Sequence, residues 1–360
     1  MHFSKKPIKK LKSILIDTGA TKGLVSIVLP VYNGGEYICE AINSVINQTY
    51  ENWELIIVDD GSNDQSGIIA DEYAKKNSKI RVIHQENQKL PTALNRGFAE
   101  AKGEYFTWLS ADNRLLPDFL YEMVGELKRK PKADMVFGNQ FLIDESGDRI
   151  SGHGWFEIPP NSGRVCFPPA TPMLNIVANN TIGAAFMYRA GTEAVLGGYS
   201  PNLFLLEDYD FFMKMNSFFN ICHIRNKRPA YEYRFHRNSL TAKDEELGIT
   251  AGRPRLMELD KYRRNRYTEP IFADFSGVPE YIAKELKKTG FVDKNPEIFI
   301  SVKKEKNKGL SYRIEEELDG FSVYKNEKKL ARIKGVKKLA IFLRFRSLCD
   351  LMREFENDFL

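Results

Sequence analysis

The 360-residue chain contains few cysteines, no long apolar run and no glycine-rich phosphate loop. Its four cysteines are far apart and form no CxxC pair, which argues against a disulfide scaffold and against a zinc site. No apolar stretch approaches the ~20 residues that a membrane-spanning helix needs. The apolar run in the basic N-terminus is too short for a signal peptide. We therefore expect a cytoplasmic protein in a reducing compartment.

Positive charge is distributed unevenly, although the net charge is only +5. Five lysines lie in the first 12 residues, and nine basic residues against one acid lie between Lys325 and Arg346. Such runs are often solvated surface. The alternative is contact with an anionic membrane surface, which we prefer to nucleic acid because no nucleic-acid motif accompanies the charge. We expect peripheral contact with the inner membrane face through the basic termini.

The central part of the chain alternates β-branched runs with amphipathic segments. Four strands are predicted, at residues 25–33, 53–60, 79–86 and 104–112. The helices predicted between them cover residues 35–48, 65–76 and 91–103. Further strands are expected at 133–144 and 180–189 and from 231 onward, with a helix at 205–219. This alternation predicts an α/β, Rossmann-like fold, with a mostly parallel sheet and helices on both faces.

Composition divides the chain into three parts. Residues 1–23 form a basic extension, residues 24–245 the α/β domain, and residues 246–360 a more charged, small α+β region. That region is expected to contain a helical linker, a small hairpin or sheet with a turn at Asp319–Gly320, and a basic helix. One face of the basic helix would carry Ile333, Val336, Ala340 and Leu343. Because Ile341, Phe342 and Phe345 lie off that face, we expect the helix to bury more than one side.

Polar residues follow three of the predicted parallel strands, and such strand ends are where α/β sheets bind ligands. Asn33, the pair Asp59–Asp60 and Asp112 would meet at one edge. No GxGxxG or GxxxxGK[ST] motif is present, which argues against a dinucleotide enzyme and a P-loop. A site that gathers carboxylates instead of glycines must handle phosphate through a metal such as Mg²⁺ or Mn²⁺.

Three motifs in order resemble family 2 glycosyltransferases. They are PVYNGGEYICEAINSVINQTYENWELIIVDDGSNDQS at 30–66, ALNRGFAEAKGEYFTWLSADN at 93–113 and EDYDFFMKM at 207–215. The resemblance covers roughly residues 24–241. It implies a GT-A type fold and inverting transfer of a sugar from a nucleoside diphosphate donor, and it implies little about residues 250–360.

The resemblance also implies a nucleotide pocket. Tyr32 would stack near the base, and Asp59 would accept a hydrogen bond from the base or ribose, which suits uracil and thymine equally. The alternative for Asp59 and Asp60 is a turn that closes a strand. The implied nucleotide-binding residues are Pro30, Tyr32, Asn33, Asp59, Asn95, Ser110 and Ala111.

Asp112 matches the last acid of the family's DxD motif and is the implied metal ligand, while Ser110 replaces the first acid. Ser110 can still contribute its hydroxyl group. His236 would complete the metal shell or contact the diphosphate, although a lone histidine is more often structural. With one carboxylate fewer, we expect weak metal binding without nucleotide and clear binding with it.

Glu207 and Asp208 match the family's ED motif. Asp208 is the implied general base, placed opposite the leaving diphosphate, with Glu207 positioning the acceptor or the loop and Asp210 as the second choice of base. The alternative is that these acids only stabilise the positive end of a helix dipole.

Other cations and aromatics are candidates for substrate contact. Arg234 and Arg237 could bind the diphosphate. Lys89 stands where the family often has glycine and could supply charge, whereas Leu94 stands where many relatives have arginine. Residues 152–172 predict a long loop at the acceptor side, in which Trp155 could pack on a sugar.

The sequence therefore predicts a metal-dependent, inverting glycosyltransferase of the hexosyltransferase type. The donor would be a UDP- or dTDP-sugar, and the acceptor a hydroxyl of a glycan or lipid-linked saccharide in bacterial surface polysaccharide synthesis. A homo-oligomer remains open. The alternatives are a non-catalytic nucleotide-sugar binder acting through its C-terminal region, and a sugar-phosphate nucleotidyltransferase. The second would need a glycine-rich loop with Arg and Lys after the first strand, and PVYNGGEY lacks those cations.

Overall fold

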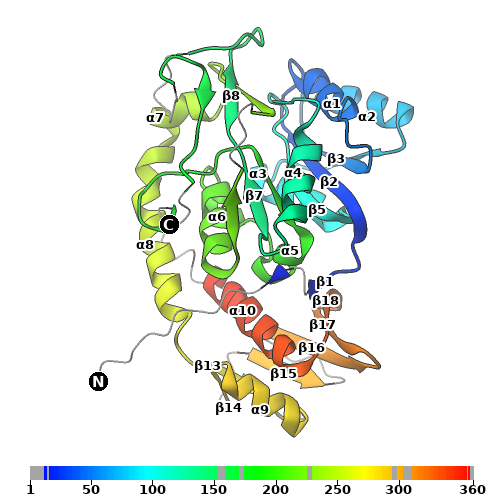
Figure 1. Cartoon of the computed structure of the whole chain (residues 1–360), viewed down its shortest axis with the longest axis vertical. Coiled ribbons are helices and arrows are strands. Elements are labelled where there is room, and N and C mark those ends of the chain that lie inside the picture. Colours follow the sequence, from blue (N-terminus) through cyan, green and yellow to red (C-terminus); the bar gives the residue numbers. More distant parts are fainter. Residues whose placement is uncertain are drawn as a thin grey trace.

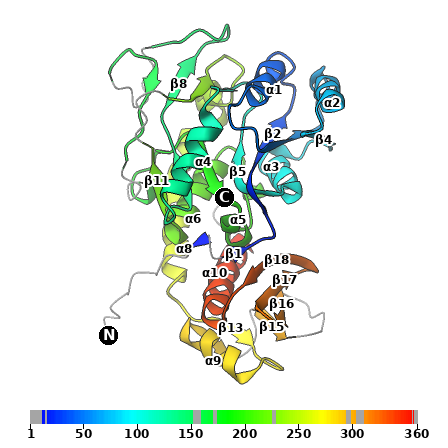
Figure 2. The ribbon, with the colours of Figure 1, turned by 45° about the vertical axis from the view of Figure 1, so that its right-hand side comes forward.

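The computed structural model describes residues 12–13, 16–151, 159–169, 174–224, 229–293, 298–302, 310–354 and 356. Two seven-stranded sheets lie toward opposite ends of the molecule, with helix α8 along one side and helix α10 between them (Figure 1). Turning the molecule by 45° shows the same separation, with α10 alongside the C-terminal sheet (Figure 2). Among the described helices, none combines the length and the apolar content needed to cross a membrane.

The first sheet contains the predicted parallel strands. Its order is β11-β7-β10-β5-β2-β3-β4, in which β10 alone runs antiparallel to its neighbours. The strands are β2 (Thr21–Val31), β3 (Trp53–Asp59), β4 (Ile80–His84), β5 (Gly103–Trp108), β7 (Met135–Phe137), β10 (Phe186–Arg189) and β11 (Ile221–His223). The expected mostly parallel α/β sheet is confirmed.

Helices bury both faces of this sheet. Along β2, Val25, Ile27 and Leu29 pack in one apolar core, whereas Val28 packs in the other. Both faces are apolar because neither meets water, as expected for parallel strands. The helices are α1 (Ile38–Ile46), α2 (Ser66–Lys76), α3 (Lys89–Glu100), α4 (Phe119–Arg129), α5 (Ala190–Leu196) and α6 (Glu207–Phe218). Those expected between the first strands are confirmed within a few residues.

The single strand predicted at 133–144 is wrong. The chain leaves the first sheet after β7 and enters a small sheet as β8 (Gln140–Ile143). The break is stabilised by hydrogen bonds that Gly138 N–H donates to Ala185 O (2.8 Å) and Phe167 N–H donates to Asn139 Oδ1 (3.0 Å). The small sheet has the order β6-β12-β8-β9, with β6 (Arg114–Leu115), β12 (Tyr231–Arg234) and β9 (Arg164–Val165).

The C-terminal region builds the second seven-stranded sheet, in the order β1-β18-β17-β16-β15-β13-β14. Its strands are β1 (Ile16–Asp17), β13 (Ile271–Asp274), β14 (Phe291–Asp293), β15 (Ile298–Val302), β16 (Leu310–Glu317), β17 (Gly320–Lys325) and β18 (Lys328–Ile333). The helices that precede or cover it are η4 (Thr241–Lys243), α7 (Asp244–Leu247), α8 (Ile249–Arg266), α9 (Glu280–Lys288) and α10 (Val336–Glu354). The hairpin expected around Asp319–Gly320 is confirmed, since β16 and β17 pair on either side of it.

Two expectations about the C-terminal helix have different outcomes. Ile333 belongs to β18, so its assignment to a helix face is wrong. Phe342 and Phe345 are buried together with Leu339 and Leu343, so the helix does bury more than one side. The division of the chain at residues 23 and 245 stays a prediction, and β1 crosses it by pairing with β18.

Candidate active site

The carboxyl ends of β2, β3 and β5 lie next to one another, as expected. Asp60 N–H donates to Val31 O (2.9 Å), and Leu109 N–H donates to Val28 O (2.9 Å). A Cβ on Gly34 would lie 3.2 Å from Ala111 Cβ, so the turn after β2 touches the turn after β5. Strand order therefore gathers the predicted nucleotide and metal residues at one edge.

The turn after β2 exposes two of the predicted nucleotide residues. The Tyr32 side chain is 52% exposed, and Asn33 is exposed with a left-handed φ of 54°. Asn33 Oδ1 accepts a hydrogen bond from Asn63 N–H (2.8 Å), which holds this unusual conformation. Backbone strain of this kind is common at ligand sites. Pro30 and Ala111 are buried, so Tyr32 and Asn33 are the residues presented to a ligand.

The Asp59 carboxylate makes more contacts within the protein than the sequence suggests. It is 6% exposed; its Oδ1 accepts from Ser62 N–H (3.0 Å), and its Oδ2 lies 2.9 Å from His84 Nδ1. The hydrogen bond with Asp59 raises the pKa of His84. Asp60 is also buried, and its Oδ1 accepts from Gln85 Nε2 and from Gln88 N–H. These contacts support the turn interpretation, and the nucleotide role of Asp59 stays a prediction.

Asn95 and Lys89, both in α3, make different contacts. Both amide atoms of Asn95 bond the Tyr199 backbone: Nδ2 donates to its O (2.7 Å), and Oδ1 accepts from its N–H (2.8 Å). These bonds commit the Asn95 amide to the protein and do not support a nucleotide contact. Lys89 has a left-handed φ of 70°, which suits glycine and accounts for the glycine of the resemblance. Its ammonium lies 6.0 Å from the Phe204 ring centroid.

Asp112 and His236 lie in contact. His236 Nε2 is 3.1 Å from Asp112 Oδ2, and the imidazole ring packs against Tyr37 at 5.0 Å between centroids. Asp112 Oδ1 is buried and has no hydrogen-bond partner among the described residues. An orphaned carboxylate oxygen beside an imidazole nitrogen fits a divalent cation whose other ligands are phosphate oxygens and water. No group of three or more His, Cys, Asp or Glu side chains within the described ranges forms a fuller metal site.

Arg234 stabilises the turn that carries Asp112. The side chain is fully buried; its Nε–H donates to Asp112 O (2.8 Å), and Nη1 donates to Asp144 O and Glu145 O. Nη2 pairs with Glu40 Oε2 at 2.6 Å. The expected diphosphate contact is therefore wrong for Arg234, because its donors are used inside the protein.

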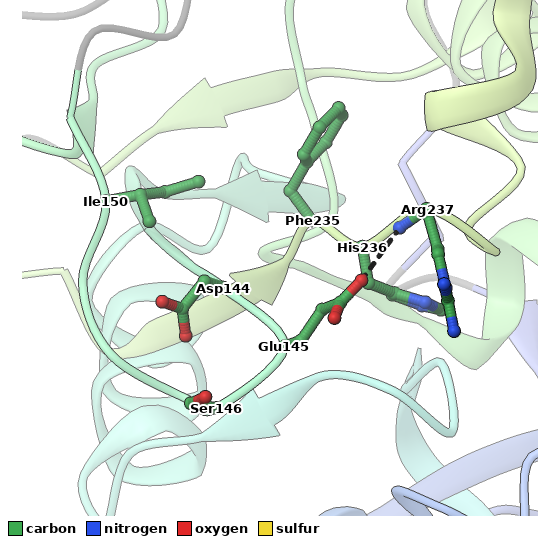
Figure 3. A pocket seen from close by; sticks show the side chains of 7 residues that line it. All are labelled: Asp144, Glu145, Ser146, Ile150, Phe235, His236 and Arg237. Carbon is green, nitrogen blue, oxygen red and sulfur yellow. Dashed lines mark hydrogen bonds between the residues drawn. The ribbon is translucent and has the colours of Figure 1, made fainter.

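A pocket of about 500 Å³ borders this turn. Figure 3 shows Asp144, Glu145 and Ser146 on one side and Phe235, His236 and Arg237 on the other. Arg237 N–H donates to Glu145 Oε1 (3.3 Å), and the Arg237 side chain is exposed. Arg237 therefore remains a candidate for contact with a phosphate.

The candidate base lies at the start of α6. Leu205, just before it, has a left-handed φ of 78°, which is strained for a bulky residue. Burial raises the pKa of Glu207 to about 8, and the adjacent Asp208 acts in the same direction. Glu207 Oε2 is buried without a hydrogen-bond partner among the described residues. Asp208 accepts from Tyr209 N–H (2.6 Å) and Asn180 Nδ2 (3.0 Å), so Asp208 is the better placed of the two to hold the negative charge.

Asp210 is wrong as a second choice of base. It is fully buried, it pairs with Arg263, and its Oδ2 lies 2.8 Å from Lys214 Nζ. The same helix buries Phe211, Phe212 and Phe218 in the core. Trp155, the candidate for sugar packing, lies outside the described residues.

Asp112 and Asp208 have a common neighbour, Tyr233. Burial raises the pKa of Tyr233, and the charges of Asp112 and Asp208 both add to that rise. Tyr233 on β12 is therefore within electrostatic reach of both. Sequence reasoning missed Tyr37, His84 and Asn180; only His84 carried a visible signal, as a polar residue at a strand end.

Comparison with known proteins identifies the family of the N-terminal part of the chain. Residues 26–193 match the model of glycosyl transferase family 2. These residues are a family 2 glycosyltransferase domain. Asp112 lies inside the matched part of the domain, whereas Asp208 and His236 lie beyond it.

Curated relatives of the family 2 domain are glycosyltransferases by name. Glycosyltransferase GlyG of Streptococcus pneumoniae serotype 4 is 40% identical over 124 residues, which are 34% of this chain and 41% of that protein. Putative glycosyltransferase EpsH of Bacillus subtilis is 44% identical over 100 residues, 28% of this chain and 29% of that protein. The chain spans less than half of the length of either relative.

Solved structures similar to the chain include S. aureus TarS 1–349 in complex with UDP. It has a TM-score of 0.47 and 17% identity, covering 73% of this chain and 68% of that one. The mannosyltransferase PcManGT of Pyrobaculum calidifontis, in complex with GDP-Man and Mn²⁺, has a TM-score of 0.40 and 17% identity. That match covers 63% of this chain and 62% of the mannosyltransferase. Neither likeness is close enough to transfer a substrate.

Proposed function

We propose that the protein is an inverting, metal-dependent hexosyltransferase that moves a sugar from a UDP- or dTDP-sugar onto a hydroxyl group. The buried, unpartnered Asp112 Oδ1, beside the strand ends that present Tyr32 and Asn33, carries this proposal. Family membership of residues 26–193 supports the reaction class. Tyr32 would stack on the base, and the Asp59 region would recognise a ring N–H.

Asp112 and His236 would hold Mg²⁺ or Mn²⁺, which when bound would neutralise charge on the leaving diphosphate. Ser110 would assist through its hydroxyl group, and Arg237 would contact the phosphates from the edge of the pocket. With two protein ligands, the site favours a metal that arrives together with the nucleotide.

Asp208 would accept the proton of the attacking hydroxyl as the new glycosidic bond forms. Two N–H donors stabilise its ionised form, and Glu207, with its raised pKa, carries the proton of the pair near neutral pH. A neutral Glu207 avoids repulsion next to the base, and its buried oxygens would orient the acceptor.

For the acceptor we propose a lipid-linked saccharide, used in surface polysaccharide synthesis at the inner membrane face. Ile176 is 69% exposed and Val177 39% exposed, just before Asn179 and Asn180. Exposed apolar side chains close to the candidate general base can contact the apolar portion of a lipid-linked acceptor, which a free sugar lacks. The basic termini add attraction to an anionic bilayer.

The test is nucleoside diphosphate release from UDP- and dTDP-hexoses with Mn²⁺. We expect Asp208→Asn to lose about 10²–10⁴-fold in rate while still binding UDP. Equal background rates in the wild type and Asp208→Asn, with UDP bound by both, would favour the non-catalytic binder. Release of pyrophosphate from a nucleoside triphosphate and a sugar phosphate would instead favour the nucleotidyltransferase.

A further inference from the structure

Helix α8, from the region that the family model does not cover, reaches the loop beside the candidate base. Arg253 Nη1 donates a hydrogen bond to Asn179 Oδ1 (3.1 Å). The next residue, Asn180, donates from Nδ2 to Asp208 Oδ2 (3.0 Å). Asn180 Oδ1 in turn accepts from Ile182 N–H (3.1 Å), which determines the side of the amide that faces Asp208. Arg253, the Asn179–Asn180 loop and Asp208 thus form one hydrogen-bonded series.

The same three elements are joined a second time, through Tyr209. Its hydroxyl group donates to Val177 O (2.8 Å) and lies 3.3 Å from Met257 Sδ on α8. Leu256 and Leu259 of α8 are buried, so the helix is packed against the domain and not merely attached to it. Arg253 is consequently anchored near the candidate base, because the helix that carries it packs against the domain and its partner loop is bonded to Tyr209.

Several charged or titratable groups act on Asp208 from the elements around it. Burial raises the pKa of Asp208, whereas the hydrogen bonds from Tyr209 N–H and Asn180 and the positive charge of Arg253 lower it. The other titratable groups that interact with Asp208 are Glu207 on α6, Tyr199 before η3 (Pro201–Leu203) and Tyr233 on β12. None of these three brings a positive charge, so the charge of Arg253 acts together with the two hydrogen bonds to offset the effect of burial on the pKa of Asp208.

We propose that Asn180 and Arg253 are positioning residues of Asp208, which makes helix α8 of the C-terminal region part of the active site. The inference rests on the proposed role of Asp208 as base. Asn180 fixes the direction of the carboxylate, and Arg253 keeps the loop in place and the carboxylate ionised. A truncated protein ending before α8 would lack this support.

The test compares Arg253→Gln with Arg253→Lys, Asn180→Leu and the matched control Arg255→Gln, which alters an exposed arginine of the same helix. In the pH profile of kcat/KM for sugar transfer, we expect the acidic limb of Arg253→Gln to move up by about one pH unit. The profile of Arg253→Lys should stay close to wild type, and that of Arg255→Gln should be unchanged. Asn180→Leu should move the limb in the same direction, with KM for the donor unaltered.

A second measurement does not depend on activity. In protein carrying ¹³C-labelled aspartate, the carboxyl signal that is missing from Asp208→Asn identifies Asp208. Its titration midpoint should rise by about one pH unit in Arg253→Gln and in Asn180→Leu. If the midpoint moves but wild type transfers no sugar, the proposed function fails and the positioning role stands. If the midpoint stays within about 0.2 pH units of the wild-type value in folded samples of both variants, the positioning role is overturned.

Discussion

Asp112 and Asp208 differ in how their oxygens are used, and this difference separates their roles. Asp208 accepts from two N–H groups, whereas Asp112 has one oxygen near His236 and one with no partner among the described residues. A carboxylate with satisfied oxygens holds its direction, and one with an orphaned oxygen is ready for a cation. The contrast could not be read from the motifs, which present both residues simply as acids.

Metal binding is predicted to depend on nucleotide. With Asp112 and His236 as the protein ligands, calorimetry should show weak Mn²⁺ binding to the empty protein and clear binding when UDP is present. Asp112→Asn should abolish the nucleotide-dependent part while UDP alone still binds. Tight uptake of Mn²⁺ by the empty wild-type protein would contradict this picture.

His84 is predicted to contribute pH-dependent stability. Its contact with Asp59 raises its pKa in the folded protein, so the contribution is complete below the unfolded value near 6.5 and is lost as the pH rises through the raised pKa. Because the His84 side chain is 50% exposed, we expect less than about 1 kcal/mol. Urea unfolding of wild type and His84→Gln should differ at pH 6 and converge at pH 9. An equal difference at both pH values would argue against this ion pair.

At the scale of elements, the packing of α3 on the sheet depends on close contact at one glycine. A Cβ on Gly97 would lie 2.5 Å from Val28 Cγ1 and 3.2 Å from Val58 Cγ2. By contrast, a Cβ on Gly125, in the middle of α4, would meet nothing within 4 Å. The two positions therefore form a matched pair of helical glycines.

We predict opposite effects of the same substitution at these two positions. Gly97→Ala should lower the free energy of unfolding by about 1–3 kcal/mol, because the added methyl group overpacks the helix–sheet contact. Gly125→Ala should raise it by about 0.4–1 kcal/mol, because the unfolded chain loses conformational freedom. Equilibrium urea unfolding measures both. Equal and small effects would show that α3 can shift away from the sheet without cost.

Much of the architecture at this scale follows from the sequence. Strand and helix periods along residues 25–112 are local properties, so the first sheet and its strand-end site were predictable. The break at Gly138–Asn139 was not, because β8 leaves the first sheet through bonds to residues far away in the chain. The 231–234 strand was expected, but its partners in a separate small sheet were not.

At the scale of the whole molecule, one buried ion-pair network joins the domain to the C-terminal region. Arg263 on α8 pairs with Asp210 on α6, and its Nη2 lies 2.5 Å from Glu356 Oε1. All three side chains are at most 1% exposed. One apolar core also runs through both regions, with Phe218 and Phe345 rings 4.9 Å apart. The C-terminal region therefore cannot be removed without exposing the back of the active-site helix.

Arg263→Leu is predicted to destabilise the whole protein. Removing the guanidinium would leave two buried acids without their shared cation, at a cost of about 3–5 kcal/mol in the free energy of unfolding. Lys261→Ala, an exposed change on the same helix, should stay within about 0.5 kcal/mol. Urea unfolding followed by fluorescence provides the comparison. A cost below 1 kcal/mol for Arg263→Leu would mean that the network does not hold the two regions together.

Two arginines of the basic C-terminal run are buried, which the sequence did not lead us to expect. Arg344 and Arg346 are buried, with Arg344 donating to Gly290 O and Tyr267 O, and Arg346 pairing with Asp350. The basic C-terminal run therefore offers fewer cations to a membrane than its composition suggests. Apart from the exposed Lys12, the N-terminal lysines lie outside the described residues, so membrane contact stays a prediction.

Local patterns in the sequence were enough to predict the parallel sheet and the order of the strand-end residues, because periodicity and strand-end polarity belong to short segments. Only the tertiary structure decided which of these residues remain available. Asn95 and Arg234 bond distant backbone, Asp210 is enclosed by Arg263 and Lys214, and Asp112 retains an orphaned oxygen. The availability of a polar atom depends on its partners, and in this protein those partners come from far along the chain.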